Sequence, residues 1–197
     1  MVVEILLIIL AYLLGSVPTG YLLGKIAGVD VRNTGSGNIG ATNIARVLGQ
    51  RQGIVTLIAD TLKGVVPVFV ALQIGLAATI TAGVALAAFL GHLYPVFLKF
   101  HGGKGVATAV GALLVWAPMA ALIIIVIFAV LALSSRIVSL GSIIAAAAAP
   151  LVLWLFGYGA ALVVTSFIFA AMIILRHRSN IERLIAGTEP RFNVNSR

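Results

Sequence analysis

Residues 105–175 read GVATAVGALLVWAPMAALIIIVIFAVLALSSRIVSLGSIIAAAAAPLVLWLFGYGAALVVTSFIFAAMIIL, and this stretch of about 70 residues decides the fold. It is mostly apolar, with breaks at Ala117-Pro118, Ser134-Ser135-Arg136 and Gly157-Tyr158-Gly159. Because proline and glycine punctuate regular structure, the breaks predict four helices, the first of them short. The apolar runs lack the alternation of a barrel strand, and lipid offers no partner to unpaired backbone groups. The helix is therefore the predicted spanning element.

The composition of the whole chain indicates the same class of protein. Of its 197 residues, 61% are hydrophobic and only 9% are charged, which is typical of an integral membrane protein and far from the usual globular mixture. Each helical crossing of a hydrocarbon layer ~30 Å thick needs ~20 residues. Residues 1–197 are therefore predicted to form a single transmembrane domain, with no room for a separate soluble domain.

Three further spanning helices are predicted before residue 105. The first runs from about Val3 to Leu23; it contains Glu4 in place of the positive start of a secretory signal, so we expect it to be retained. The second runs from about Ile54 to Ile74 with a kink at Pro67, and the third from about Leu76 to Phe97. The predicted fold class is an all-α integral membrane protein, a compact bundle of seven transmembrane helices, some of them short.

The distribution of Lys and Arg predicts the orientation, because these residues accumulate in cytoplasmic loops. With seven crossings, the cytoplasmic connections contain Lys25, Arg32, Arg46, Arg51, Lys99, Lys104 and Arg136. The amino terminus is then outside, and residues 184–197 form a short polar cytoplasmic tail. A six-crossing bundle, which merges the helices around Pro118, fits worse because it places Arg136 and the basic tail outside. The net charge of +8 follows from this topology and requires no nucleic acid.

Three polar segments interrupt the apolar chain, all on the predicted cytoplasmic face. The first polar segment reads Gly35-Ser36-Gly37-Asn38-Ile39-Gly40-Ala41-Thr42-Asn43, which is too polar to span and too long for a two-residue turn. It predicts a folded loop. If a helix begins near Ala41, its N-terminal amides and Arg46 face one anion. The alternative is an ordinary interhelical linker.

The second polar segment, Gly102-Gly103-Lys104-Gly105, superficially resembles a nucleotide-binding P-loop. That pattern requires a glycine where this chain has Leu98, and Ser or Thr after the lysine, so we predict no mononucleotide site. A lysine among glycines at the mouth of a helix is still suited to bind phosphate. The alternative is that Lys104 only snorkels to the membrane surface.

Glycines elsewhere follow a spacing of four. Gly20, Gly24 and Gly28 are predicted to let helices pack closely, as small residues do in membranes. Gly103, Ala107 and Gly111 have the same spacing, so Gly103 can serve both packing and chemistry.

The third polar segment is Arg176-His177-Arg178-Ser179-Asn180-Ile181-Glu182-Arg183. If the last membrane helix continues inward, His177 and Asn180 lie on one of its faces. Five helical residues would place His177 and Glu182 about 140° apart, which argues against an acid–base pair. We expect Glu182 to pair with Arg178. We expect His92, near the end of the third helix, to have a structural role.

Taken in order, these motifs resemble one family, the bacterial acyl-phosphate:glycerol-3-phosphate acyltransferases. The similarity covers nearly the whole chain and rests on three motifs. They are the first polar segment, then His101-Gly102-Gly103-Lys104-Gly105-x-Ala107-Thr108, and then Arg176-His177-x-x-Asn180-Ile181-x-Arg183-Leu184-x-x-Gly187-x-Glu189. Asp60-x-x-Lys63-Gly64 and Gly91-His92-x-Tyr94-Pro95 also look like family features. The resemblance implies transfer of a fatty acyl group from acyl phosphate to the 1-hydroxyl of sn-glycerol 3-phosphate, giving lysophosphatidic acid and inorganic phosphate.

The resemblance also implies roles for particular residues. Expected catalytic residues are Ser36, Arg46, Lys104, His177 and Asn180. Expected substrate- and phosphate-binding residues are Gly37, Asn38, Gly40, Thr42, Asn43, Gly102, Gly103, Gly105 and Ser142. Asp60, Lys63, Glu182 and Arg183 are expected to support them. No nucleophile–base–acid triad is apparent, so we expect direct attack by the glycerol hydroxyl, with its proton taken by a substrate phosphate or by His177.

The chain contains no cysteine, and neither a metal site nor a cofactor is expected. Acyl phosphate and glycerol 3-phosphate are the implied substrates, membrane lipids the surroundings, and a monomer in the bacterial inner membrane the expected state. The alternative function is a transporter or channel for a phosphorylated solute. It is disfavoured because the spanning segments contain almost no ionisable residue beyond Asp60 and Lys63. A scaffold without chemistry leaves the polar segments unexplained.

Overall fold

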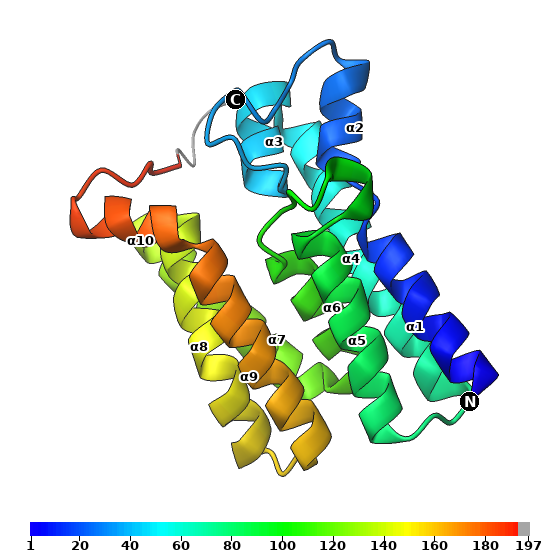
Figure 1. The fold of residues 1–197 in the computed structure, drawn as a ribbon. Coiled ribbons are helices and arrows are strands. Elements are labelled where there is room, and N and C mark those ends of the chain that lie inside the picture. Colours follow the sequence, from blue (N-terminus) through cyan, green and yellow to red (C-terminus); the bar gives the residue numbers. More distant parts are fainter. Residues whose placement is uncertain (193–197) are drawn as a thin grey trace. The chain divides into compact units, whose positions relative to one another are not determined.

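The computed structural model describes residues 1–192, and these residues are helical with no strand. The elements are α1 (Val2–Gly15), α2 (Thr19–Ile26), α3 (Ala41–Leu48), α4 (Gln50–Gln73), α5 (Ala78–Leu93), the 3-10 turn η1 (Val96–Leu98), α6 (Val106–Trp116), α7 (Pro118–Ser135), α8 (Val138–Leu155), α9 (Ala160–Arg176) and α10 (Arg178–Ile185). They form two compact units, Met1–Trp116 and Ala117–Arg197, coloured blue to green and green to red in Figure 1. The last five residues of the predicted 184–197 tail lie outside the described residues.

Five helical segments of the described chain are long and apolar enough to cross a membrane, or six if the bent pair α9 and α10 counts as one. The predicted all-α membrane fold is therefore confirmed. The four helices predicted within residues 105–175 are present as α6 to α9. As expected, the first is short: α6 has 11 residues and is about 17 Å long. The count of seven crossings stays a prediction.

The first predicted spanning segment, Val3 to Leu23, is present as one apolar span over Val2–Ile26, but this span is not one continuous helix. The structure breaks it at Ser16–Pro18 into α1 and α2. Proline lacks the amide hydrogen that a helix interior needs, and it disfavours helical geometry in the residue before it. By contrast, α4 continues through Pro67 to Gln73.

Glycines bring the helices of the first unit into close contact. α1 packs against α5, and α4 packs against α6. A Cβ at Gly15 would overlap the backbone of Ala88, and one at Gly64 would overlap the carbonyl oxygen of Thr108. Without a hydrophobic driving force in lipid, such close backbone approach supplies the van der Waals contact that holds membrane helices together.

Gly20, Gly24 and Gly28 were predicted to let helices pack closely, and the structure bears this out for the first two. A Cβ at Gly20 would overlap the Ile39 carbonyl, and one at Gly24 would lie 2.6 Å from the Val31 side chain. The prediction is wrong for Gly28, which has φ +72° and nothing within 4 Å of a built Cβ. Its N–H donates to Lys25 O, and it ends α2 in the left-handed conformation that glycine tolerates.

The second unit is a row of three helices with a bent end. α7 packs against α8, and α8 against α9; α10 follows α9 (Figure 1). The last membrane helix does not continue inward as one straight helix, because α9 ends at Arg176 and α10 leaves at an angle of 59°. His177 lies at the bend with ψ near 9°, outside regular helix. Arg176 and Arg183 therefore do not share one continuous helical face.

Candidate active site

One buried amide shapes the first polar segment. Asn43 lies in the first turn of α3 and is 2% exposed. Its Oδ1 accepts the Ser36 N–H at 2.8 Å. Its Nδ2 donates to the carbonyl oxygens of Val31, Thr34 and Asn38, at 3.2, 3.1 and 2.9 Å respectively. This Asn43 network, meaning Asn43 with its four backbone partners, makes the segment a folded loop and not an ordinary linker.

The loop needs glycine at two of its bends. Gly35 and Gly37 have φ of 64° and 70°, a region that residues with a Cβ rarely adopt. A Cβ at Gly35 would also overlap Asn43 Oδ1. The Asn38 side chain accepts the Gly40 N–H at 2.8 Å and fixes the entry to α3. The positive φ angles therefore require glycine at positions 35 and 37. A loop that turns its N–H groups around a small anion also requires glycine at such bends.

Three residues predicted to act on substrate in this region have exposed side chains, whereas Asn43, also predicted to bind phosphate, is buried. α3 begins at Ala41 with Gly40 as its N-cap, so the condition stated for an anion site at its first turn is met. Ser36, Thr42 and Arg46 are exposed, and the last two lie four residues apart on one face of α3. The structure therefore separates two roles: Asn43 is buried and orders the loop, whereas its exposed neighbours are available to a ligand.

An ion pair fixes the start of the same connection. The Arg32 guanidinium donates to both carboxylate oxygens of Asp30, at 2.9 and 2.7 Å, and lies 4.7 Å from the centre of the Tyr21 ring. Hydrogen bonds from the Arg32 side chain and then from its backbone N–H lower the pKa of Asp30 to about 2. The loop thus carries an internally neutralised pair.

The second polar segment folds back on the end of α5. The N–H groups of Gly102 and Gly103 donate to Leu93 O and His92 O, both at 3.1 Å. Gly105 has φ 82°, which favours glycine. α6 begins at Val106, so Lys104 lies at the mouth of a helix as predicted, with a half-buried side chain.

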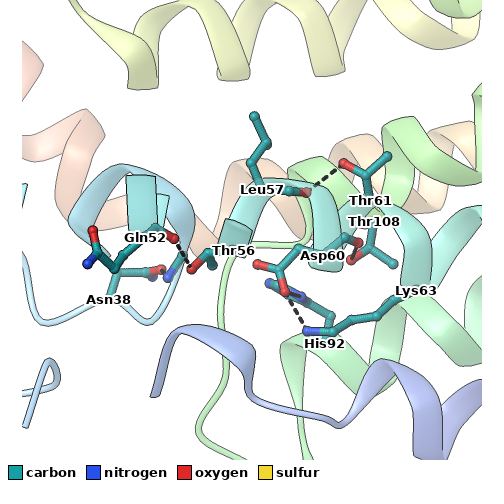
Figure 2. A network of polar contacts seen from close by, with 10 residues as sticks. Asn38, Gln52, Thr56, Leu57, Asp60, Thr61, Lys63, His92 and Thr108 are labelled. Carbon is teal, nitrogen blue, oxygen red and sulfur yellow. Dashed lines mark hydrogen bonds and ion pairs between the residues drawn. The ribbon is translucent and has the colours of Figure 1, made fainter. Parts of the chain in front are cut away.

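A buried polar cluster lies beside this segment (Figure 2). Asp60 and Lys63 of α4 form an ion pair with both side chains 5% exposed. His92 Nδ1 of α5 lies 3.8 Å from Asp60 Oδ1. Thr108 Oγ1 of α6 donates to the Asp60 carbonyl oxygen at 2.8 Å. Three helices of the first unit thus meet at Asp60, consistent with the structural role expected for His92.

The third polar segment is ordered by a carboxylate. Glu189 accepts hydrogen bonds from Ser139 Oγ and Asn180 Nδ2, both at 2.6 Å, and from Arg183 Nε at 2.7 Å. Its side chain is 7% exposed. Burial alone raises the pKa of Glu189, but the three hydrogen bonds and the Arg183 charge outweigh it and lower that pKa below its ordinary value of 4.5. We call Glu189 and these three partners the Glu189 network.

Other predicted residues of the second unit have identifiable partners. His177 and Asn180 are buried, at 3% and 5% exposure, and His177 Nδ1 lies 2.8 Å from Ile173 O. Ser142 donates to Val138 O at 3.0 Å within α8. Glu182 pairs with Arg178 at 3.1 Å on the exposed face of α10, as expected.

No role was predicted for Glu189 from the sequence. It stands in the third motif, but nine residues and a helix end separate it from Asn180. Helical periodicity cannot relate residues across such an end. The available signal was an acid placed after a glycine turn in a chain with few acids. In residues 1–192 no group of three or more His, Asp or Glu residues could hold a metal ion.

These features define a class: an all-helical integral membrane protein in which buried polar networks order glycine-rich and basic loops. Residues 5–187 match the family model described as glycerol-3-phosphate acyltransferase, and the chain belongs to that family.

Named relatives and solved structures are similar over nearly the whole chain. The glycerol-3-phosphate acyltransferase of Geobacter metallireducens is 55% identical over 98% of this chain and 100% of the relative. That of Aquifex aeolicus is 44% identical over 94% and 97%. The crystal structure of PlsY (YgiH), an integral membrane glycerol 3-phosphate acyltransferase, in its glycerol 3-phosphate form has a TM-score of 0.94 and 43% identity over 96% of each chain. Its lysophosphatidic acid form has a TM-score of 0.90 and 42% identity over 96% of this chain and 95% of that one.

Proposed function

We propose that this protein transfers a fatty acyl group from acyl phosphate to the 1-hydroxyl of sn-glycerol 3-phosphate, giving lysophosphatidic acid and inorganic phosphate. The observation that carries the proposal is family membership over residues 5–187, a range that contains all three polar segments. The glycerol oxygen attacks the carbonyl carbon of the donor. The bond from that carbon to the phosphate oxygen breaks, and phosphate leaves with the electron pair. No acyl-enzyme forms.

The first polar segment is the proposed site for the acyl phosphate. Ser36 and the backbone N–H groups around Gly37, Asn38 and Gly40, together with Thr42, bind the donor and polarise its carbonyl oxygen as an oxyanion site does. Asn43 contributes by ordering the loop, because its amide is already bonded to four backbone groups. Donors fixed before substrate binds need no reorganisation during the reaction, which is the basis of this kind of stabilisation.

Positive and polar side chains bind the phosphate groups in this proposal. Arg46 and Lys104 are contributed by the first unit, with Gly102, Gly103 and Gly105 giving the backbone close approach to phosphate. His177, Asn180 and Ser142 are further proposed phosphate-binding residues. Asp60, Lys63, Glu182 and Arg183 support these residues without contacting substrate. Membrane lipids surround a monomer, which needs neither cofactor nor metal.

The hydroxyl proton goes to a phosphate oxygen of a substrate. The second pKa of a phosphate monoester is ~6, so such an oxygen can accept a proton near neutral pH. His177 is the competing base: with its Nδ1–H donating to Ile173 O, the neutral ring has its acceptor lone pair at Nε2. A His177→Gln variant with near-normal turnover would exclude the histidine as base.

The topology belongs to the same proposal. Seven crossings place the amino terminus outside and the basic connections, including Arg46, Lys104 and Arg136, in the cytoplasm of a bacterial cell, with the protein in the inner membrane. The substrate-binding loops then face the compartment of a water-soluble glycerol phosphate.

The test is a stoichiometric assay of purified protein in lipid. Palmitoyl phosphate is supplied with and without glycerol 3-phosphate, and both phosphate and lysophosphatidic acid are measured. We expect equal amounts of the two products, formed only with glycerol 3-phosphate, and a loss of at least ~100-fold in Lys104→Ala. Lys25→Ala, an exposed lysine of the same unit, is the control and should retain activity. Intact palmitoyl phosphate in the presence of folded wild-type protein would refute the proposal.

A further inference from the structure

The buried polar cluster of the first unit has a feature that helix packing does not require. α4 and α6 already approach closely through glycine, since a Cβ at Gly64 would overlap the Thr108 carbonyl and one at Gly111 that of Thr61. Burying an ion pair such as Asp60–Lys63 removes two charges from water. Apolar residues of similar volume are often as stable or more so, which makes a buried pair weak evidence for stability. The cluster therefore calls for a different explanation.

The cluster contacts the loop that contains Lys104. The imidazole of His92 lies against Gly103 so closely that a Cβ at Gly103 would overlap His92 Nε2 and lie about 3 Å from two ring carbons. The His92 carbonyl accepts the Gly103 N–H at 3.1 Å. On its other side the ring faces Asp60 at 3.8 Å (Figure 2). One residue thus links the ion pair to the backbone immediately before Lys104.

The chain after Lys104 also contacts Asp60. Thr108, in the first turn of α6 and 1% exposed, donates to the Asp60 carbonyl oxygen at 2.8 Å. Gly103 precedes Lys104 and Thr108 follows it. Gly103 contacts His92, which faces Asp60, and Thr108 bonds to Asp60 directly. Between Gly103 and Thr108, Gly105 adopts φ 82°, a conformation that favours glycine.

We propose that Asp60, Lys63 and His92 form a positioning unit that fixes the Gly103–Thr108 backbone and thereby aims Lys104 at a substrate phosphate. This role rests on the proposed function of Lys104. Lys63 holds the Asp60 carboxylate, the carboxylate orients the imidazole, and the imidazole supports Gly103. None of the three residues contacts substrate.

The first experiment measures the position of Lys104 without relying on turnover. Purified protein in lipid is treated with a water-soluble acetylating reagent, and the labelling rates of Lys104 and Lys25 are followed by mass spectrometry. We expect His92→Phe to change the Lys104 rate at least threefold and to leave the rate of exposed Lys25 unchanged. His92→Asn keeps an N–H near Asp60 but lacks the ring edge that contacts Gly103, so it should change the Lys104 rate as well. Val84→Ala, a cavity variant in the core of the same helix, should leave both rates unchanged.

The second experiment is a double-variant cycle on kcat/KM for glycerol 3-phosphate. We expect His92→Phe to lower kcat/KM about tenfold in the wild-type background and by less than twofold in Lys104→Gln. The paired replacement Asp60→Leu with Lys63→Met, which leaves no unpaired charge, should stay folded and show the same pattern.

The outcomes separate this inference from the proposed function. A tenfold loss that persists in Lys104→Gln, or a Lys104 labelling rate that His92→Phe does not change, would overturn the positioning role even if acyl transfer is established. Absence of transfer in the wild-type protein would refute the proposed function instead, and the labelling result would still decide whether the cluster positions Lys104.

Discussion

The first and third polar segments are both ordered by one buried side chain, but the two side chains differ in kind. The Asn43 network uses a neutral amide that bonds only to backbone groups within twelve residues. The Glu189 network uses a carboxylate that bonds to side chains from α8 and α10, as far as 50 residues away. The neutral Asn43 amide shapes one loop through local contacts. The charged Glu189 carboxylate joins helices that are distant in sequence, and its contribution to stability depends on pH.

Removal of the Asn43 amide should have the largest effect on activity. Asn43→Ala leaves the Ser36 N–H and three carbonyl oxygens without their partner, so the donors of the proposed oxyanion site lose their arrangement. We expect kcat/KM to fall by at least ~100-fold, a loss comparable to that of an oxyanion donor. Asn33→Ala, at an exposed position of the same connection, is the control and should stay within twofold. Equal losses in the two variants would show that the loop tolerates any disturbance poorly and that Asn43 is not its centre.

Removal of the Glu189 charge should affect stability more than the chemistry of the donor loop. Hydrogen bonds to charged groups contribute about 1.5–3 kcal/mol each, so we expect Glu189→Gln to lower the free energy of unfolding by about 2 kcal/mol. That corresponds to a fall of about 5 °C in the unfolding temperature of a chain of this size, measured in detergent micelles. An unchanged unfolding temperature would mean that the carboxylate adds nothing that a neutral amide does not.

Acid should distinguish the two networks. The pKa of Glu189 is lowered in the folded protein, so its contribution to stability is fully present above the ordinary value of 4.5 and is lost as the pH falls through the lower folded-state pKa. The difference in unfolding temperature between wild type and Glu189→Gln should therefore be constant from pH 8 to about 5 and shrink below about 4.5. The difference between wild type and Asn43→Ala should stay constant over the same range, because an amide does not titrate. Parallel behaviour of the two variants would contradict the assignment.

The smallest effect is expected at the exposed pair on α10. Glu182 and Arg178 lie 3.1 Å apart with side chains 63% and 87% exposed, and such helical pairs contribute about 0.3–0.5 kcal/mol. Glu182→Gln should shift the unfolding temperature by no more than about 1–2 °C. A shift as large as that of Glu189→Gln would mean that charge on α10, and not the buried network, stabilises this end of the unit.

Local patterns predicted much of this structure. Four helices in residues 105–175 follow from apolar runs and their polar breaks, and α3 begins at Ala41, the start considered for a helix within the first polar segment. Both depend on neighbours in sequence. The exposed positions of Ser36 and Arg46 also agree with their expected contact with an anion, although their roles stay proposals.

Features set by tertiary contacts could not be predicted. Gly28 shares its spacing with two packing glycines but ends a helix, and only its φ of +72° reveals the difference. The break at Pro18 depends on whether neighbouring elements satisfy the carbonyls that proline leaves without a partner. The chain bends at His177 and α10 ends before Glu189, so helical periodicity could not relate Asn180 to Glu189. The Glu189 network therefore could not be predicted from the sequence pattern.

Direct transfer from acyl phosphate to glycerol 3-phosphate is the central claim, and a single-turnover experiment tests it most directly. Excess enzyme in lipid is mixed with palmitoyl phosphate alone, quenched at intervals, and analysed for released phosphate and for the intact mass of the protein. Glycerol 3-phosphate is then added. We predict no phosphate release and no gain in protein mass until it is added, and then lysophosphatidic acid and phosphate in equal amounts. A burst of phosphate with a protein heavier by one palmitoyl group, before any glycerol 3-phosphate is present, would contradict the account.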